Sequence, residues 1–178
     1  SAPQSSDLRR SPPLRRAHAR SRMIPSDSAG CSVGIEFAFH TVQAQGLAAA
    51  LKATCDKVAV ATGVQCEFVV TGSAKRFPLR AEEQLLRIGQ EAVTNAIRHA
   101  SPQRIQVMLD YDDRNVHLRV SDDGRGFDPS VSPAEQEGHW GLADMRERAK
   151  RIGAKFTLST EPGQGTRIET TVPFKLAS

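Results

Sequence analysis

Cysteine is scarce in this chain of 178 residues, and Cys31, Cys55 and Cys66 have neither the spacing of metal ligands nor a secretory segment upstream. An odd count of this kind argues against a disulfide framework and favours a reducing cytoplasm. Long apolar runs are also lacking, since none approaches the roughly 18 to 20 residues of a membrane-spanning helix. The composition, 39% hydrophobic and 25% charged, is ordinary for one globular domain and excludes collagen, coiled coil and wholesale disorder.

The net charge of +4 is confined to the start of the chain. Residues 1–34 hold six arginines and two aspartates, whereas the rest of the chain holds 18 basic and 18 acidic side chains. We expect residues 1–43 to form a flexible arm rich in Arg, Ser and Pro, because this composition buries too little apolar surface to offset the ordering entropy. An arginine-rich arm is suited to nucleic acid or an anionic membrane. The absence of aromatic residues from positions 1–30 favours a solvated linker instead, so there is no firm nucleic-acid signal.

Hydrophobic periodicity predicts one domain over residues 44–176. Apolar residues at helical spacing predict helices at Gly46–Ala61, Leu79–Ala100 and Leu142–Ile152. Alternating or β-branched runs bounded by turn residues predict strands at Val64–Thr71, Ile105–Leu109, Val116–Ser121, Lys155–Thr160 and Thr166–Phe174. Their order predicts an α+β fold, a two-layer sandwich with helices on one face of a mixed, mostly antiparallel sheet.

The second predicted helix has a polar stripe beside its apolar face. At 100° per residue, Glu91, Asn95, Arg98 and His99 share one arc that borders the core. A carboxylate, an amide and two basic side chains at this spacing suit a hydrated divalent cation bound together with a polyphosphate. The alternative is an ion-paired surface helix.

A glycine-rich segment follows the strand that ends at Ser121. Asp122 precedes Gly124 and Gly126, which permit a close backbone approach to a ligand, and its carboxylate is suited to accept a hydrogen bond from a bound amine. The alternative is an ordinary turn. Residues 128–140 then form a long loop without apolar periodicity, which is typical of a functional or disordered segment.

Two further glycine pairs complete the set of candidate sites. Gly138 and Gly141 flank His139 at the start of the third helix, where exposed N–H groups attract anions. Gly163 and Gly165 lie in the last hairpin, followed by Thr166. A simple helix start and a simple hairpin turn are the respective alternatives.

The ordered combination of these motifs is more specific than any one of them. It resembles the N, G1, G2 and final glycine boxes of the GHKL ATPase superfamily, and within it the ATP-binding catalytic domain of sensor histidine kinases of the NarL/UhpB/DesK type. The stretches Ile88–Ala100 and Gly138–Ala154 carry the likeness to that type, and the resemblance covers about residues 47–174. It implies the Bergerat (GHKL) ATPase fold with ATP and Mg²⁺ as ligands.

The resemblance also implies roles for individual residues. Asp122 would accept a hydrogen bond from the adenine amine, Asn95 would reach Mg²⁺, and Glu91 would order a water or act as general base. Arg98 and His99 would lie near the triphosphate, and Asp128–Glu137 would form a lid. The implied catalytic residues are Glu91 and Asn95, and the implied ATP-binding set is Asn95, Arg98, His99, Asp122, Gly124, Gly126, Phe127, Gly138, His139, Gly141, Leu142, Gly165 and Thr166.

The phosphoacceptor is the part of the family pattern that this sequence lacks. His40 and the residues after it are similar to the acceptor motif, but Thr41 replaces the expected acid. In addition, the 51 positions between His40 and Glu91 leave no room for two dimerisation helices. His18 fits no better. We therefore expect an isolated catalytic domain, part of a longer protein that is homodimeric, that partners a dimerisation and phosphoacceptor domain, and that acts on a response regulator.

Two other classes of function remain open at this point. One is a related ATP-binding protein, either an anti-sigma-type serine kinase or an ATPase of the gyrase, chaperone and mismatch-repair kind. The other is a non-catalytic scaffold or a nucleic-acid-binding arm, although the intact Asn95 and Asp122 argue against a degenerate site.

Overall fold

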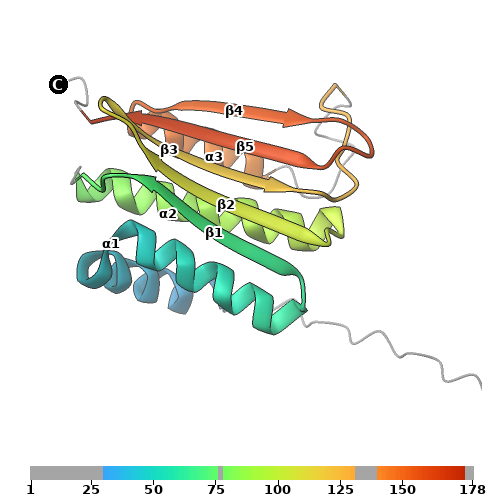
Figure 1. Cartoon of the computed structure of the whole chain (residues 1–178), viewed down its shortest axis with the longest axis horizontal. Coiled ribbons are helices and arrows are strands. Elements are labelled where there is room, and N and C mark those ends of the chain that lie inside the picture. Colours follow the sequence, from blue (N-terminus) through green and yellow to red (C-terminus); the bar gives the residue numbers. More distant parts are fainter. Residues whose placement is uncertain (1–29, 76–77, 131–139, 175–178) are drawn as a thin grey trace, which may run out of the picture.

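The computed structural model describes residues 30–75, 78–130 and 140–174, with side chains for residues 46–75, 78–130 and 141–174. Figure 1 shows α2 and α3 behind a sheet, with α1 packed beside α2. The elements are α1 (Gly30–Thr62), β1 (Gln65–Gly72), α2 (Leu79–Asn95), the π-helix η1 (Ala96–Ala100), β2 (Arg104–Tyr111), β3 (Asn115–Asp122), α3 (Trp140–Arg151), β4 (Lys155–Thr160) and β5 (Thr166–Pro173). No helix in these ranges is long and apolar enough to span a membrane.

The five strands form one sheet in the order β1-β2-β3-β5-β4. The first pair, β1 and β2, is parallel, and every other pair is antiparallel. The parallel pair follows from its connection, because α2 crosses over between β1 and β2, whereas tight turns join β2 to β3 and β4 to β5. The predicted two-layer α+β sandwich with a mixed, mostly antiparallel sheet is confirmed.

The core lies between the sheet and α2. Leu85, Ile88 and Ala92 recur at helical spacing on the buried face of α2. Alternate residues of β2 and β3 are buried against them, as the period of two in a half-buried strand requires. This packing brings the C-terminal end of α2 beside the ends of β3 and β5, where the polar motifs lie.

The predicted helix at Gly46–Ala61 starts later than the observed one. In the structure α1 begins at Gly30 and kinks at Gly46, where φ is 80° and ψ is 166°. Proline is absent between Pro25 and Pro78, so the backbone chemistry does not stop a helix before Gly46. Residues 30–43 of the predicted arm are therefore helical, and residues 1–29 lie outside the described residues.

The second predicted helix is also not a continuous α-helix. It changes at Asn95 to a π-helix over residues 96–100, and Ser101 then adopts a left-handed conformation with φ of 49°. Pro102 follows directly, and the residue before proline avoids the α-helical region. A π-turn in a helix is often found at a functional site.

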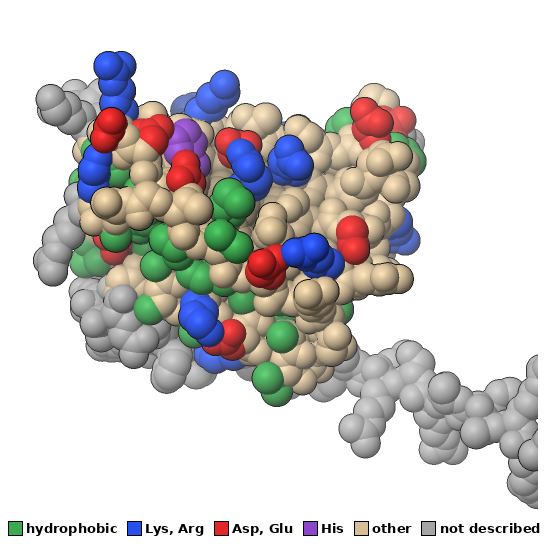
Figure 2. All heavy atoms as spheres, viewed as in Figure 1, with side chains coloured by type: hydrophobic (Ala, Val, Ile, Leu, Met, Phe, Trp, Pro, Cys, Tyr) green, Lys and Arg blue, Asp and Glu red, His purple; other side chains and the backbone are tan. Residues whose placement is uncertain are grey.

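The outer face of the sheet carries charges of both signs (Figure 2). Arg104 pairs with Glu67 at 2.5 Å and Arg119 with Glu169 at 3.4 Å, both across neighbouring strands. Such cross-strand pairs neutralise basic side chains that would otherwise attract a polyanion. These pairs link β1 to β2 and β3 to β5 on the outer face of the sheet.

Candidate functional site

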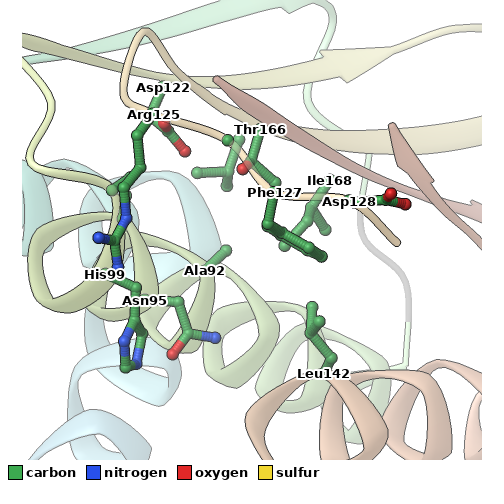
Figure 3. A pocket seen from close by; sticks show the side chains of 14 residues that line it. Ala92, Asn95, His99, Asp122, Arg125, Phe127, Asp128, Leu142, Thr166 and Ile168 are labelled. Carbon is green, nitrogen blue, oxygen red and sulfur yellow. The ribbon is translucent and has the colours of Figure 1, made fainter. Parts of the chain in front are cut away.

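A cavity of about 460 Å³ lies between the C-terminal part of α2, η1 and the ends of β3 and β5. Figure 3 shows Asp122 and Thr166 on its sheet side, Asn95 and His99 on its helical side, and Leu142 from α3. Its apolar walls come from Ala92, Val120 and Ile168 among others. A concave, mostly apolar site with a few convergent polar groups is typical of a small-molecule pocket.

The cavity brings together seven of the predicted ATP-binding residues from four separate regions of the sequence. They are Asn95, His99, Asp122, Gly126, Phe127, Leu142 and Thr166. Gly124, Gly141 and Gly165 lie against this cavity without lining it, as described below. Gly138 and His139 lie outside the described residues, as do residues 131–137 of the predicted lid.

Two adjacent aspartates at the end of β3 have different environments. Asp122 lines the cavity, and its Oδ1 accepts a hydrogen bond from the Gly124 N–H at 2.9 Å. Burial raises the pKa of Asp122, while backbone N–H groups of Gly124 and Thr166 act in the opposite direction. The Asp122 carboxylate is therefore half-buried in the wall of the cavity and partly desolvated before a donor arrives.

Asp123 faces away from the cavity. Its Oδ1 accepts hydrogen bonds from the backbone N–H groups of Gln103 and Arg104, at 2.8 and 2.9 Å. These bonds, led by the one from Arg104, lower the pKa of Asp123. Asp123 thus anchors the start of β2 to the end of β3, and the two aspartates divide between ligand binding and structure.

Three glycines let backbone segments meet around Asp122. A Cβ on Gly124 would lie 2.5 Å from both the Cβ and the carbonyl oxygen of Ala100. Gly165 has φ of +71°, and its Cβ would collide with the carbonyl oxygen of Asp122, while Gly126 is similarly close to Glu161 and Gly165. The absence of a Cβ at these positions therefore permits close contacts between protein segments, and Gly126 also lines the cavity.

Glu91 and Asn95 approach the N-terminal turn of α3 at Gly141. A Cβ on Gly141 would lie 3.0 Å from Asn95 Nδ2 and would collide with Glu91 Oε1. A larger residue at this position would require the Glu91 and Asn95 side chains to move. The polar stripe of α2 therefore meets the predicted anion-binding end of α3, as the order of the motifs suggested.

The structure distinguishes the two basic residues of the predicted stripe. His99 lines the cavity and Arg98 does not, although both side chains are exposed. Both residues lie in the π-helix η1. A π-turn contains more residues than an α-turn, so the angles between side chains after Asn95 differ from those of an α-helix.

Two polar residues near the cavity were missed by the sequence reasoning. Arg125 lines it and lies between Gly124 and Gly126, so the glycine-rich segment could have pointed to it. Asp128, the first residue of the predicted lid, also lines the cavity. Thr160 lies behind the cavity and binds Phe127 and Gly165 through its hydroxyl. Nothing in the local sequence marks Thr160, because its partners are remote along the chain.

Among the described residues, no group of three or more His, Cys, Asp or Glu side chains could hold a metal ion. Asn95 lines the cavity and Glu91 lies beside it near Gly141, and both side chains carry oxygen atoms that suit a cation. His40 lies in α1 before the kink at Gly46, and no more than this is described for it.

Comparisons with known proteins match the part of the chain that contains the cavity. Residues 80–176 match the family described as histidine kinase-, DNA gyrase B- and HSP90-like ATPases. The sensor protein VraS of Staphylococcus aureus (strain COL) is 40% identical over 98 residues, which are 55% of this chain and 27% of VraS. The histidine-protein kinase/phosphatase DegS of Brevibacillus brevis is 31% identical over 112 residues, 63% of this chain and 28% of DegS.

Solved structures show the same fold. The blue-light activated histidine kinase EL346 of Erythrobacter litoralis superposes with a TM-score of 0.62 at 19% identity, over 80% of this chain and 52% of that chain. The histidine kinase AdeS of Acinetobacter baumannii superposes with a TM-score of 0.58 at 14% identity, over 82% of this chain and 78% of that chain. The chain spans little more than a quarter of the length of the curated relatives it matches.

Proposed function

Because the chain belongs to the family of histidine kinase-, DNA gyrase B- and HSP90-like ATPases, and has the fold of histidine kinase catalytic domains, we propose that it binds Mg²⁺·ATP in the cavity beside Asp122. It presents the γ-phosphate to a histidine on the dimerisation domain of a two-component sensor kinase. The observation that carries this proposal is the enclosed carboxylate of Asp122 opposite Asn95 in one cavity of about 460 Å³.

Asp122 selects the base. Its carboxylate accepts a hydrogen bond from the exocyclic amine of adenine, and guanine has a carbonyl oxygen at that position. Two acceptors facing each other in an enclosed site leave both unpaired, which disfavours guanine. The apolar walls formed by Ala92, Val120 and Ile168 suit the faces of a purine ring.

Asn95 and Glu91 are the residues that fit a magnesium ion. Mg²⁺ keeps several waters and takes one or two protein ligands together with substrate phosphates, so two oxygen-bearing side chains beside the start of α3 are a sufficient set. When bound, the ion neutralises charge on the phosphates. Glu91 is also placed to order a water or accept a proton at the same end of the cavity.

The protein's part in phosphoryl transfer is to bind and orient ATP. A nitrogen of the acceptor histidine forms a bond to the γ-phosphorus as the bond to the β,γ-bridging oxygen breaks, and ADP leaves. Positioning and electrostatic stabilisation supply most of the acceleration in such reactions. The partners we propose are therefore a dimerisation domain carrying the histidine, and a response regulator that receives the phosphoryl group in the cytoplasm.

Replacing Asn95 with alanine is expected to remove most of the Mg²⁺ dependence of ATP binding. We expect the affinity for a non-hydrolysable ATP analogue to fall about tenfold in the presence of Mg²⁺ and little in its absence, because one direct ligand of the ion is lost. Calorimetric titration with and without Mg²⁺ measures both.

Thr94→Ala is the matched control, because the Thr94 hydroxyl donates to the Gln90 carbonyl at 2.7 Å within the helix. Its affinity for the analogue should equal that of the wild type. A folded wild-type protein that binds no analogue would instead favour a scaffold, and phosphorylation of a serine substrate would favour the serine-kinase alternative.

Base recognition is expected to weaken at acidic pH. Burial raises the pKa of Asp122 above its ordinary value of 3.8, so its carboxylate loses charge at a higher pH than an exposed aspartate would. The adenine amine needs the deprotonated acceptor, so affinity is full above the folded pKa of Asp122 and declines as the pH falls through it. Titration with adenosine, which has no phosphates, measures this affinity as a function of pH. The Asp122→Asn variant should not show the decline in affinity at acidic pH.

A further inference from the structure

The hydroxyl of Thr160 joins three backbone segments at the end of β4. It accepts a hydrogen bond from the Phe127 N–H at 3.1 Å and donates to the Gly165 carbonyl at 3.0 Å. It also lies 3.3 Å from the hydroxyl of Thr166, its neighbour in the β4–β5 pairing. A hydroxyl suits this position because it is both a donor and an acceptor.

These contacts surround the residue that we propose to recognise adenine. Phe127 and Thr166 line the cavity, whereas Thr160 does not. Gly165 packs directly on the carbonyl of Asp122, and Asp122 is paired with Thr166 across β3 and β5. A second link runs from the Gly163 N–H to the Arg125 carbonyl at 2.6 Å. The glycine-rich segment and the last hairpin thus hold Asp122 between them.

We propose that Thr160 is a positioning residue for nucleotide selectivity. Its hydroxyl sets the distance between the glycine-rich segment and the β4–β5 turn, and so aims Asp122 and Thr166 at the base. The inference rests on the proposed function, since it concerns the same site. A change of a few tenths of an ångström is enough to weaken a hydrogen bond to a bound base, whereas the rest of the cavity, from α2 and α3, is untouched.

The test compares three variants of the full chain. Thr160→Val keeps the side-chain shape and removes the hydroxyl, and Thr160→Ser restores the hydroxyl. Thr157→Val makes the same change at an exposed position of the same strand. Binding of ATP is compared with binding of inosine triphosphate, which has a carbonyl where adenine has its amine. Competition against one fluorescent ATP analogue gives the affinities for ATP and for inosine triphosphate.

We expect Thr160→Val to lower the preference for ATP over inosine triphosphate about tenfold, mainly by weakening ATP binding. Thr160→Ser and Thr157→Val should retain the wild-type preference. A purely structural role would lower the melting temperature and leave the preference unchanged, which would overturn the inference. If the wild type itself shows no preference for ATP, the proposed role of Asp122 fails first, and the two failures are thereby distinguished.

Amide hydrogen exchange provides a measurement that needs no variant. In nucleotide-free wild-type protein, the N–H of Phe127 should exchange slowly although it lies in a segment without regular secondary structure. Rapid exchange at Phe127 would contradict the hydrogen bond on which the inference rests, and this outcome is accessible even if Thr160→Val fails to fold.

Discussion

Asp122→Asn is expected to weaken binding of the ATP analogue roughly 30- to 150-fold, because a hydrogen bond to a charged acceptor contributes about 2 to 3 kcal/mol. Asp122 lines the cavity and has two backbone donors, from Gly124 and Thr166, that hold its carboxylate in place. The asparagine amide has one acceptor oxygen, which the Gly124 N–H already uses, and it turns a donor toward the adenine amine. Preference for ATP over inosine triphosphate should fall with it.

The stability of the Asp122→Asn variant should not fall with its affinity for the nucleotide. Burial raises the folded-state pKa of Asp122 above the unfolded value, so ionisation costs stability as the pH rises through the folded pKa. A neutral amide avoids that cost. We therefore expect the free energy of unfolding of Asp122→Asn at neutral pH to equal or exceed that of the wild type.

Asp123→Asn is the matched control one residue away. The pKa of Asp123 is lowered in the folded state by hydrogen bonds from Arg104 and Gln103. Its carboxylate therefore stabilises the fold above the unfolded pKa, and this contribution is lost as the pH falls. The control should melt at a lower temperature and bind the analogue as the wild type does. Equal affinity losses in both variants would contradict the division of roles between the two aspartates.

Gly165→Ala is expected to have the largest effect on stability, about 3 kcal/mol or more. Gly165 has φ of +71°, which is strained for alanine, and the added Cβ would collide with the Asp122 carbonyl oxygen. That oxygen belongs to the paired backbone of β3 and β5, so it cannot move aside without breaking the sheet. Nucleotide binding should be lost together with stability, because the displaced residue is Asp122.

Gly163→Ala separates strain from collision in the same turn. Gly163 has φ of +80°, yet nothing lies within 4 Å of a Cβ at that position. It should cost only the backbone strain, about 1 to 2 kcal/mol. Urea unfolding of both variants gives the comparison. A similar cost for the two variants would mean that the turn relaxes and that Gly165 does not support Asp122 in this way.

Local patterns in the sequence were sufficient to predict the order of the elements and the type of most of them. Helical spacing in α2 and alternation in β2 and β3 are local patterns, because they follow from 3.6 residues per turn and from the two faces of a strand. The polar motifs could also be recognised from neighbouring residues alone. The resemblance of their order to that of a known family led us to expect Asn95, Asp122 and Thr166 in one site, and the cavity contains all three.

The roles of the remaining residues followed from contacts between segments that are remote along the chain. The alternation along β3 places Asp122 on the same face as Val120, but the structural role of Asp123 depends on the pairing of β2 with β3, which brings the backbone of Gln103 and Arg104 beside it. Thr160 binds Phe127 and Gly165 because the last hairpin meets the glycine-rich segment. Periodicity and residue type do not encode such contacts, because the partners are far apart in the sequence.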